Sequence, residues 1–179
     1  MRLRALTAAT VAAALSSAGC GALDDLTASP ANGARQQATI ERAVDGDTLL
    51  VRTADGQRQR VRLLAIDTPE SVRPGIAPEC LAKKASANLA RLAPSGARVT
   101  LRRDPTQDAE DRYGRWLRYA AVDGRDLGLQ QVRAGLADVY VFDGNPAKRV
   151  ARYQAAARKA RSRGAGVWGA CGGDFHRGP

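Results

Sequence analysis

Residues 48–70 read TLLVRTADGQRQRVRLLAIDTPE, and this stretch decides the fold. Two strand-like runs, 48–53 and 57–65, flank an Asp-Gly pair at 55–56, which is a strong signal for a tight hairpin turn. Arg58, Arg60 and Arg62 lie on one face of the second run and Val61 and Leu63 on the other, as expected for a strand with one buried face. The stretch therefore predicts two antiparallel strands that lead into the acidic segment Asp-Thr-Pro-Glu.

Further strands and helices follow on both sides of this hairpin. Three more strand-like runs are present, at 37–44, 97–102 and 115–122. Apolar spacing and flanking Gly or Pro residues predict helices at 80–92, 126–134 and 147–163. Five strands interleaved with three helices in a small basic chain favour an α+β fold with a five-stranded β-barrel of the OB type and three packed α-helices. A generic α+β arrangement is the alternative that this pattern leaves open.

The composition favours a single basic domain with extensions. The chain has 179 residues, and 28 Lys and Arg against 18 Asp and Glu give a formal charge of +10. Such a balance favours polyanionic partners, either nucleic acid or an anionic membrane. An Arg-rich soluble protein without such partners would have the same composition. Aromatic residues make up only 4% of the chain, so the core must consist mainly of aliphatic side chains.

The N-terminus reads as an export signal over residues 1–20. Two arginines precede an apolar segment, 3–15, that is too short to span a membrane comfortably, and small residues follow it. The ending Ala18-Gly19-Cys20 resembles a bacterial lipobox, which predicts a lipid anchor on Cys20, with simple secretion as the alternative. The mature protein is then an exported lipoprotein of the cell membrane or a secreted protein.

The rest of the chain divides into three parts. Residues 21–36 are small and polar and are expected to form a flexible tether. The domain is expected over 37–170, and residues 171–179 form a tail that is loose unless Cys171 fixes it. If Cys20 carries lipid, Cys80 and Cys171 remain as an even pair in an oxidising compartment, which favours a disulfide between them. Two unpaired buried thiols are the alternative.

Two acidic segments together indicate a site for a hard cation. Asp47 lies in the Asp-Gly-Asp-Thr turn between two strands, and Asp67 lies at the end of the next strand. Each alone is consistent with an ordinary turn. Because neighbouring strands carry them, both carboxylates can reach one ion, and such an ion polarises a bound phosphate. Glu70 follows three residues after Asp67 and is then placed to orient or deprotonate a water molecule.

Basic and aromatic residues near these acids suit a phosphodiester substrate. The guanidinium groups of Arg62 and Arg115 match phosphate oxygens in shape and could stabilise the charge of a pentacoordinate transition state. Tyr113 could stack on a base. The alternatives are solvated surface charges for the arginines and an ordinary loop aromatic for the tyrosine.

Three segments, 44–48, 61–70 and 111–117, resemble the signature blocks of the staphylococcal nuclease family. They occur in the order and at the spacing of that family, and the similarity runs from about Thr39 to Trp168. The downstream run Gly-Leu-Ala-Asp-Val-Tyr, which ends at Tyr140, is also similar to the family pattern.

The resemblance implies an OB-fold barrel and a calcium-dependent nuclease that cleaves the 5′ P–O bond of DNA and RNA and leaves 3′-phosphates. The calcium ligands of the family match Asp47, Asp67 and the backbone carbonyl of Thr68. Its general base or water-positioning glutamate matches Glu70. The family's phosphate-binding arginines match Arg62 and Arg115, and its nucleotide-pocket tyrosines match Tyr113 and Tyr140.

Basic residues on the expected helices extend this interpretation. Lys83 and Lys84 on the first helix, with the many basic residues of the last one, predict sequence-independent attraction to phosphates, although a solvated helix face explains them as well. The family usually has an acidic residue near the position of Lys84, so a structural ion pair is in doubt there. His176 in the tail is expected to be incidental, and the protein is expected to be a monomer.

A second function class is a non-catalytic OB-fold module that binds single-stranded nucleic acid at the cell envelope. A third is an envelope lipoprotein that uses the domain only for protein contacts. A binding module gains nothing from Asp47, Asp67 and Glu70 in a groove for phosphates, because carboxylates without a bound cation repel them. Their presence beside two arginines favours the enzyme.

Overall fold

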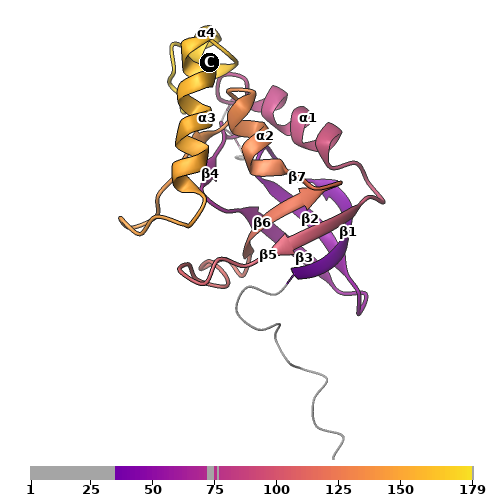
Figure 1. The fold of residues 1–179 in the computed structure, drawn as a ribbon. Helices are drawn as coiled ribbons and strands as arrows, with labels where there is room; N and C mark the ends of the chain where they lie inside the picture. Colours follow the sequence, from indigo (N-terminus) through magenta and orange to yellow (C-terminus); the bar gives the residue numbers. More distant parts are fainter. Residues whose placement is uncertain (1–34, 72–74, 76, 179) are drawn as a thin grey trace, which may run out of the picture.

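The computed structural model describes residues 35–71, 75 and 77–178, and its centre is a closed five-stranded barrel (Figure 1). The barrel strands are β1 (Arg35–Ala43), β2 (Thr48–Thr53), β3 (Arg58–Leu63), β5 (Arg98–Arg102) and β6 (Trp116–Val122). β1 pairs with β2 and β5, β2 pairs with β3, and β5 pairs with β6, all antiparallel. A parallel pairing of β3 with β6 closes the ring. The predicted OB-type fold is therefore confirmed.

Three two-residue strands complete the β-structure. β7 (Arg125–Asp126) extends the main sheet beyond β6. β4 (Ile66–Asp67) and β8 (Asp138–Val139) pair with each other in a separate small sheet. These short strands were not predicted from the sequence, because two residues are too few to show alternation.

The barrel interior is filled by aliphatic side chains, as the composition requires. In β3 the arginines face outward, whereas Val61 and Leu63 are buried. Leu49 and Val51 of β2 and Leu101 of β5 are fully buried and pack in the same cluster. Burying side chains of this size stabilises the fold by about 1.5–3 kcal/mol each. The hairpin register that places them is set by the turn after Thr53, as predicted.

Four helices cover one side of the barrel (Figure 1). They are α1 (Ala82–Leu92), α2 (Leu127–Arg133), α3 (Val150–Ser162) and the short α4 (Val167–Ala170). α1 begins two residues later than predicted, because Leu81 at its N-cap is left-handed with φ 61°. α3 begins at Val150 rather than at Ala147, and α4 was not predicted. Among the described residues, no helix has the length and apolar character needed to cross a membrane.

The C-terminal segment forms a small second core with the start of α1. Cys80 and Cys171 are joined by a disulfide, in agreement with the predicted pairing. Phe175 is 4% exposed and packs edge-on against Trp168, with ring centroids 5.0 Å apart. The backbone N–H of Cys80 donates to the carbonyl of Arg177 at 2.8 Å. The tail is thus held against the domain, which is the outcome expected if Cys171 is fixed.

The expected strand run 37–44 is longer in the structure, since β1 already starts at Arg35, inside the expected tether. The predicted export signal, the lipidation residue Cys20 and the tether up to residue 34 lie outside the described residues.

Candidate active site

Asp47 is the best-buried acid of the site and is held from two sides. It is 6% exposed and lies in the turn between β1 and β2. Its Oδ2 accepts hydrogen bonds from the backbone N–H of Thr68 at 3.0 Å and from the Thr68 hydroxyl at 2.9 Å. Its Oδ1 accepts from the Thr48 hydroxyl at 3.1 Å. Asp45 caps the turn, because its Oδ1 accepts from the backbone N–H of Asp47 at 3.0 Å. The turn therefore has a fixed geometry that joins it to the segment after β4.

Close packing explains the glycine in this turn. A Cβ atom on Gly46 would lie 2.5 Å from Oγ1 of Thr68 and 2.9 Å from Cβ of Ala85 in α1. The fully buried Gln131 of α2 donates to the carbonyl of Gly46 at 2.6 Å and to that of Ala85 at 2.9 Å. Only a residue without a side chain lets the turn approach Thr68 and α1 this closely. The role of Gln131 was not predicted from the sequence, because it depends on helix packing rather than on a motif.

Arg62 joins the two predicted metal ligands. Its Nε lies 3.2 Å from Oδ1 of Asp47, and its Nη2 lies 2.7 Å from Oδ1 of Asp67. Its Nη1 donates to the backbone carbonyls of Leu63 and Ile66, at 3.1 and 2.7 Å. The side chain is only 15% exposed, so these contacts fix the guanidinium plane. The structure thus brings Asp47, Asp67 and Arg62 together, and this group is called the acidic cluster below.

The small sheet of β4 and β8 positions the other half of the cluster. Asp67 pairs with Asp138 across this sheet, and Thr68 follows directly. The backbone N–H of Tyr140, just after β8, donates to the carbonyl of Ala65 at 3.1 Å. The Tyr140 side chain is 46% exposed. β8 therefore places one of the two predicted nucleotide-pocket tyrosines beside the strand that carries Asp67.

The cluster holds more negative than positive charge. Burial, together with the nearby charge of Asp47, raises the pKa of Asp45 to about 6. Burial also raises the pKa of Asp67, although the Arg62 guanidinium opposes this and the charge of Asp47 adds to it. Within the described residues, Arg62 is the one arginine or lysine that pairs with these carboxylates. An added cation would relieve this excess of negative charge.

The donor atoms fit a hard cation such as Ca²⁺. Asp47, Asp67 and the backbone carbonyl of Thr68 offer oxygen ligands, which hard cations prefer, and Ca²⁺ completes its shell with waters. In the part of the chain that the structure describes, no three His, Cys, Asp or Glu side chains form a ready-made metal cluster. The set therefore suits an ion that keeps several water ligands and is shared with a substrate oxygen.

Glu70 follows three residues after Asp67 in the chain. Its backbone N–H donates to Oε2 of Glu79 at 2.6 Å, and its carbonyl accepts from the backbone N–H of Glu79 at 3.0 Å. These two bonds fix the backbone of the Thr-Pro-Glu segment. Glu70 is partly exposed, so its side chain is accessible to water.

Arg115 and Tyr113 form a separate group on the loop before β6. The carboxylate of Asp111 accepts from the backbone N–H groups of Tyr113 and Arg115, at 2.9 and 3.1 Å. Nε of Arg115 lies 2.7 Å from Oδ2 of Asp111. Burial alone would raise the pKa of Asp111, but the hydrogen bonds from Arg115 and Tyr113 lower it below its usual value. Gly114, with φ 71°, makes the tight turn possible.

This loop is attached to the strand that carries Arg62. Nε2 of Gln59 in β3 donates to the carbonyl of Gly114 at 2.9 Å, and Trp116 pairs with Val61. Among the described residues, no contact joins Arg115 directly to the acidic cluster. Both arginines are predicted from the sequence to face one ion. In the structure Arg62 lies within the acidic cluster, and Arg115 pairs with Asp111 on the loop before β6. The Tyr113 ring is 67% exposed beside them.

Lys83 and Lys84 are exposed in the first turn of α1. The opposite face of that helix, with Ala82 and Ala85, is buried against the domain. The two lysines have no ion pair within the described residues, so their charges are available to an anion.

Two residues near the cluster were missed or dismissed on sequence alone. Phe142 is 62% exposed, and its ring centroid lies 6.5 Å from that of Tyr140. His176 lies between two carboxylates: its Nε2 is 3.3 Å from Oδ2 of Asp67, and its Nδ1 is 3.3 Å from Oε2 of Glu79. On sequence alone His176 is expected to be incidental, and the structure adds these two contacts with carboxylates. In the sequence, only the expected Cys80–Cys171 disulfide indicated that the tail could lie near the site.

Comparisons with known proteins agree with this geometry. Residues 60–170 match the family described as Staphylococcal nuclease homologue. The chain is 37% identical over 131 residues to the SPbeta prophage-derived endonuclease YokF of Bacillus subtilis, a match that covers 73% of this chain and 43% of that protein. It is 34% identical over 141 residues to endonuclease YncB of the same organism, covering 78% and 65%. A thermonuclease of Staphylococcus intermedius is 32% identical over 129 residues, covering 72% and 74%.

The matched part is less than two thirds of the length of either Bacillus relative. The matched residues in this chain include β3, the acidic segment after it, the Asp111 loop and the helices that pack on the barrel. The shared fold, the motif order and the family match lead to one conclusion: this chain belongs to the staphylococcal nuclease family.

Proposed function

We propose that this protein is a calcium-dependent phosphodiesterase that hydrolyses DNA and RNA. The observation that carries the proposal is the acidic cluster, in which the buried Asp47 and the half-buried Asp67 share one guanidinium and the backbone of Thr68 closes the group. A Ca²⁺ ion held by Asp47, Asp67 and the carbonyl of Thr68 would neutralise a phosphate oxygen and polarise the phosphorus.

The protein's own residues supply the remaining functions. Arg62 is rigidly oriented beside the carboxylates and presents positive charge to the scissile phosphate. Arg115 adds the second guanidinium when the phosphate bridges the two groups. Glu70 orients a water molecule or accepts its proton for in-line attack, which breaks the 5′ P–O bond and leaves a 3′-phosphate.

Exposed aromatic and basic groups suit the flanking nucleotides. Tyr113 and Tyr140 present rings to solvent on separate loops, where bases can stack on them without regard to sequence. Lys83 and Lys84 add positive charge from α1. The contacts proposed here involve phosphates and base faces only, so we expect little sequence preference and activity on both DNA and RNA.

The non-catalytic binding module is the weaker alternative. Asp47 is buried and Asp67 is half-buried, and hydrogen bonds and ion pairs hold both within the acidic cluster. Without a cation they oppose phosphate binding, so a module that only binds nucleic acid would be better without them.

We also propose that the protein is exported and acts as a monomer. The Cys80–Cys171 disulfide supports export, because such bonds persist in oxidising compartments. Mass spectrometry of the mature N-terminus distinguishes a lipid anchor at Cys20 from simple cleavage. A cytoplasmic protein with an intact N-terminus would contradict export.

The decisive test is digestion of plasmid DNA and of RNA by the purified protein. Calcium should support digestion, and a chelator should abolish it. Glu70→Gln should lower turnover by orders of magnitude, whereas Asp108→Asn, at an exposed acid outside the site, should leave it unchanged. Digestion that proceeds equally well with the chelator, or with Glu70→Gln, contradicts the proposal. Binding without digestion in calcium would favour the module instead.

A further inference from the structure

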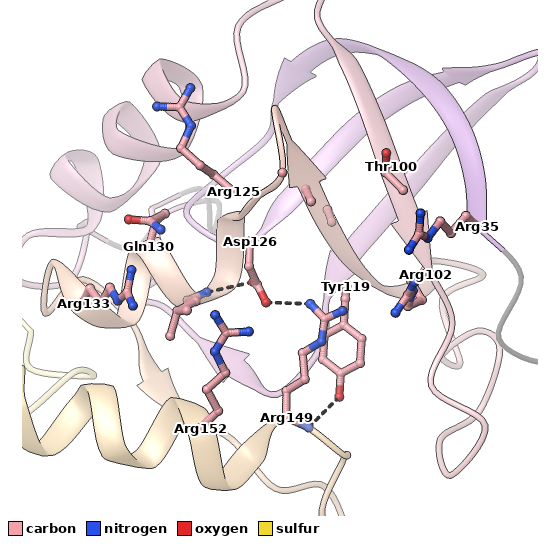
Figure 2. A pocket seen from close by; sticks show the side chains of 14 residues that line it. Arg35, Thr100, Arg102, Tyr119, Arg125, Asp126, Gln130, Arg133, Arg149 and Arg152 are labelled. Atoms are coloured by element: carbon pink, nitrogen blue, oxygen red, sulfur yellow. Dashed lines mark hydrogen bonds and ion pairs between the residues drawn. The ribbon is translucent and has the colours of Figure 1, made fainter.

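A basic site that is separate from the acidic cluster lies between the barrel and the helices α2 and α3 (Figure 2). It is a cavity of about 560 Å³, which is the size range of ligand sites. Its lining includes six arginines from five elements: Arg35, Arg102, Arg125, Arg133, Arg149 and Arg152. Figure 2 shows Arg149 and Arg152 reaching from α3 toward α2, with Arg35 and Arg102 on the barrel side.

The single carboxylate in this lining is already neutralised. Oδ2 of Asp126 lies 2.6 Å from Nη1 of Arg149, and its Oδ1 accepts from the Tyr153 hydroxyl at 2.8 Å. The Arg149 guanidinium also lies 4.0 Å from the centre of the Tyr119 ring, so this arginine is structural. Among the described residues, the acidic partner of Arg125 is the exposed Asp123, whose Oδ2 lies 3.4 Å from Nη2 of Arg125.

The positive charges of the other four arginines are not balanced by a carboxylate. Within the described residues, no carboxylate lies at ion-pair distance from any of Arg35, Arg102, Arg133 and Arg152. Four guanidinium groups that face one cavity without counterions repel one another, and an anion in the cavity would remove that repulsion. This concentration of positive charge is the first observation that indicates a ligand.

The cavity continues into an extended groove. A second cavity of about 400 Å³ shares Leu129, Arg133 and Arg152 with the first. It adds Lys159 and Arg163 along α3. We call the two together the α2–α3 groove. Two adjoining cavities that are both lined by cations suit a polymer of phosphates better than a single small anion.

Helix α2 separates this groove from the acidic cluster. Gln131 points to the cluster side and binds the carbonyl of Gly46, whereas Gln130 and Arg133 line the groove. A strand that occupies the groove therefore makes contacts additional to those at the scissile phosphate.

We propose that the α2–α3 groove binds the sugar–phosphate backbone of the nucleic-acid substrate, outside the part that is cut. This inference rests on the proposed function for the nature of the ligand. An anionic membrane is less suitable, because membrane-binding surfaces combine basic residues with apolar ones. Among the described residues, the exposed large apolar side chains are Tyr113, Tyr140 and Phe142, and none of them lines the groove.

The test compares two double variants with the same change in charge. Arg133→Glu with Arg152→Glu reverses charge in the groove. Arg98→Glu with Arg158→Glu does so at two exposed arginines that do not line it. Binding of a fluorescent single-stranded DNA is measured in chelator, where no digestion occurs, at several salt concentrations. Thermal melting checks that both variants fold, and Arg133→Gln with Arg152→Gln replaces the first variant if it does not.

The groove variant should bind the DNA at least about tenfold more weakly than the control variant. The slope of log K against log salt concentration should be shallower by about 0.7 for each lost phosphate contact. Its turnover of a dinucleotide, which is too short to reach the groove, should equal that of the wild type. Equal DNA binding by the two variants would overturn the proposal.

Two further outcomes separate the alternatives. If the groove variant binds vesicles of anionic phospholipid more weakly than the wild type but binds DNA equally well, the groove is a membrane site and the proposal is wrong. If the protein shows no nuclease activity while the groove variant still loses DNA binding, the proposed function fails and the groove assignment stands.

Discussion

Nε2 of His176 lies 3.3 Å from Oδ2 of Asp67, although the two residues lie at opposite ends of the domain sequence. The contact occupies one carboxylate oxygen of a proposed calcium ligand. His176 is 60% exposed, so the contact contributes at most about 1 kcal/mol. We expect His176→Ala to tighten binding of Ca²⁺ together with a nucleotide by up to about fivefold, as measured by calorimetry. Weaker binding would show instead that the imidazole supports the ion.

Arg62→Gln tests the balance of charge in the acidic cluster. Removing this guanidinium leaves Asp47 and Asp67 without their shared partner, and breaking a buried pair costs about 3 kcal/mol. In chelator, the free energy of unfolding should fall by about that amount. Calcium should then stabilise the variant more than the wild type, because the two carboxylates regain a counterion. Arg60→Gln, at an exposed position of the same strand, is the control. Equal stabilisation by calcium in all three proteins would contradict the proposed ion site.

Arg115→Ala tests whether the second arginine acts in the reaction. If Arg115 stabilises the transition state, turnover should fall by about two orders of magnitude, which corresponds to about 3 kcal/mol. Arg112→Ala is the matched control, since Arg112 also lies over the Tyr113 ring but has no ion pair with Asp111. If the two variants lose activity equally, stacking on Tyr113 rather than charge explains the effect. An unchanged rate would make Arg115 a structural partner of Asp111.

The disulfide has a measurable effect on stability. Cys80 and Cys171 are 91 residues apart, so closing this loop stabilises the fold by about 4.6 kcal/mol in the entropic account. Replacing both cysteines by serine should lower the free energy of unfolding in urea by about that amount. A reductant should destabilise the wild type to the same level and have no effect on the double variant. A reductant that leaves the wild type unchanged would contradict a disulfide in the exported protein.

Asp104 makes stability depend on pH in the acid range. It is 1% exposed, and burial alone would raise its pKa. Hydrogen bonds from Tyr119, Thr106 and the backbone of Lys148 outweigh burial and lower the pKa below 3.8. Because the folded pKa is below the unfolded one, the contribution is complete above about pH 4 and is lost as pH falls further.

Asp104→Asn should therefore lower the free energy of unfolding by about 1–3 kcal/mol at pH 7, and the difference should shrink below about pH 4. Denaturant melts at several pH values measure this. Asp108→Asn, at an exposed acid four residues away, should show no such dependence. A difference that stays constant down to pH 2 would show that the charge of Asp104 is not what stabilises the fold.

The sequence was sufficient for the β2–β3 hairpin because the signals for it are local. The Asp-Gly turn and the alternating arginines of β3 determine the hairpin, and the structure differs by only a residue or two at the ends of that strand. The small sheet of β4 and β8 could not be predicted in this way, since its stability comes from packing against the rest of the domain. The start of α1 was predicted too early because Leu81 adopts a left-handed conformation beside the disulfide.

The candidate site shows the same division. Asp47, Asp67 and Arg62 were found from motifs, and the structure brings them into contact. The pairing of Arg115 with Asp111 was not predicted, because it depends on a tight turn within one loop that the motif does not specify. Gln131 and His176 reach the site only through tertiary packing, from α2 and from the tail respectively. No local pattern marks such residues.

The parallel pairing of β3 with β6 has a consequence for biosynthesis. The two strands are separated by the whole segment between Leu63 and Trp116, so the ring cannot close until β6 has left the ribosome. β8, which orders the strand of Asp67, emerges later still. A nascent chain therefore holds Asp47 and Asp67 on an open ribbon, and the proposed ion site is assembled only when synthesis of the domain is nearly finished.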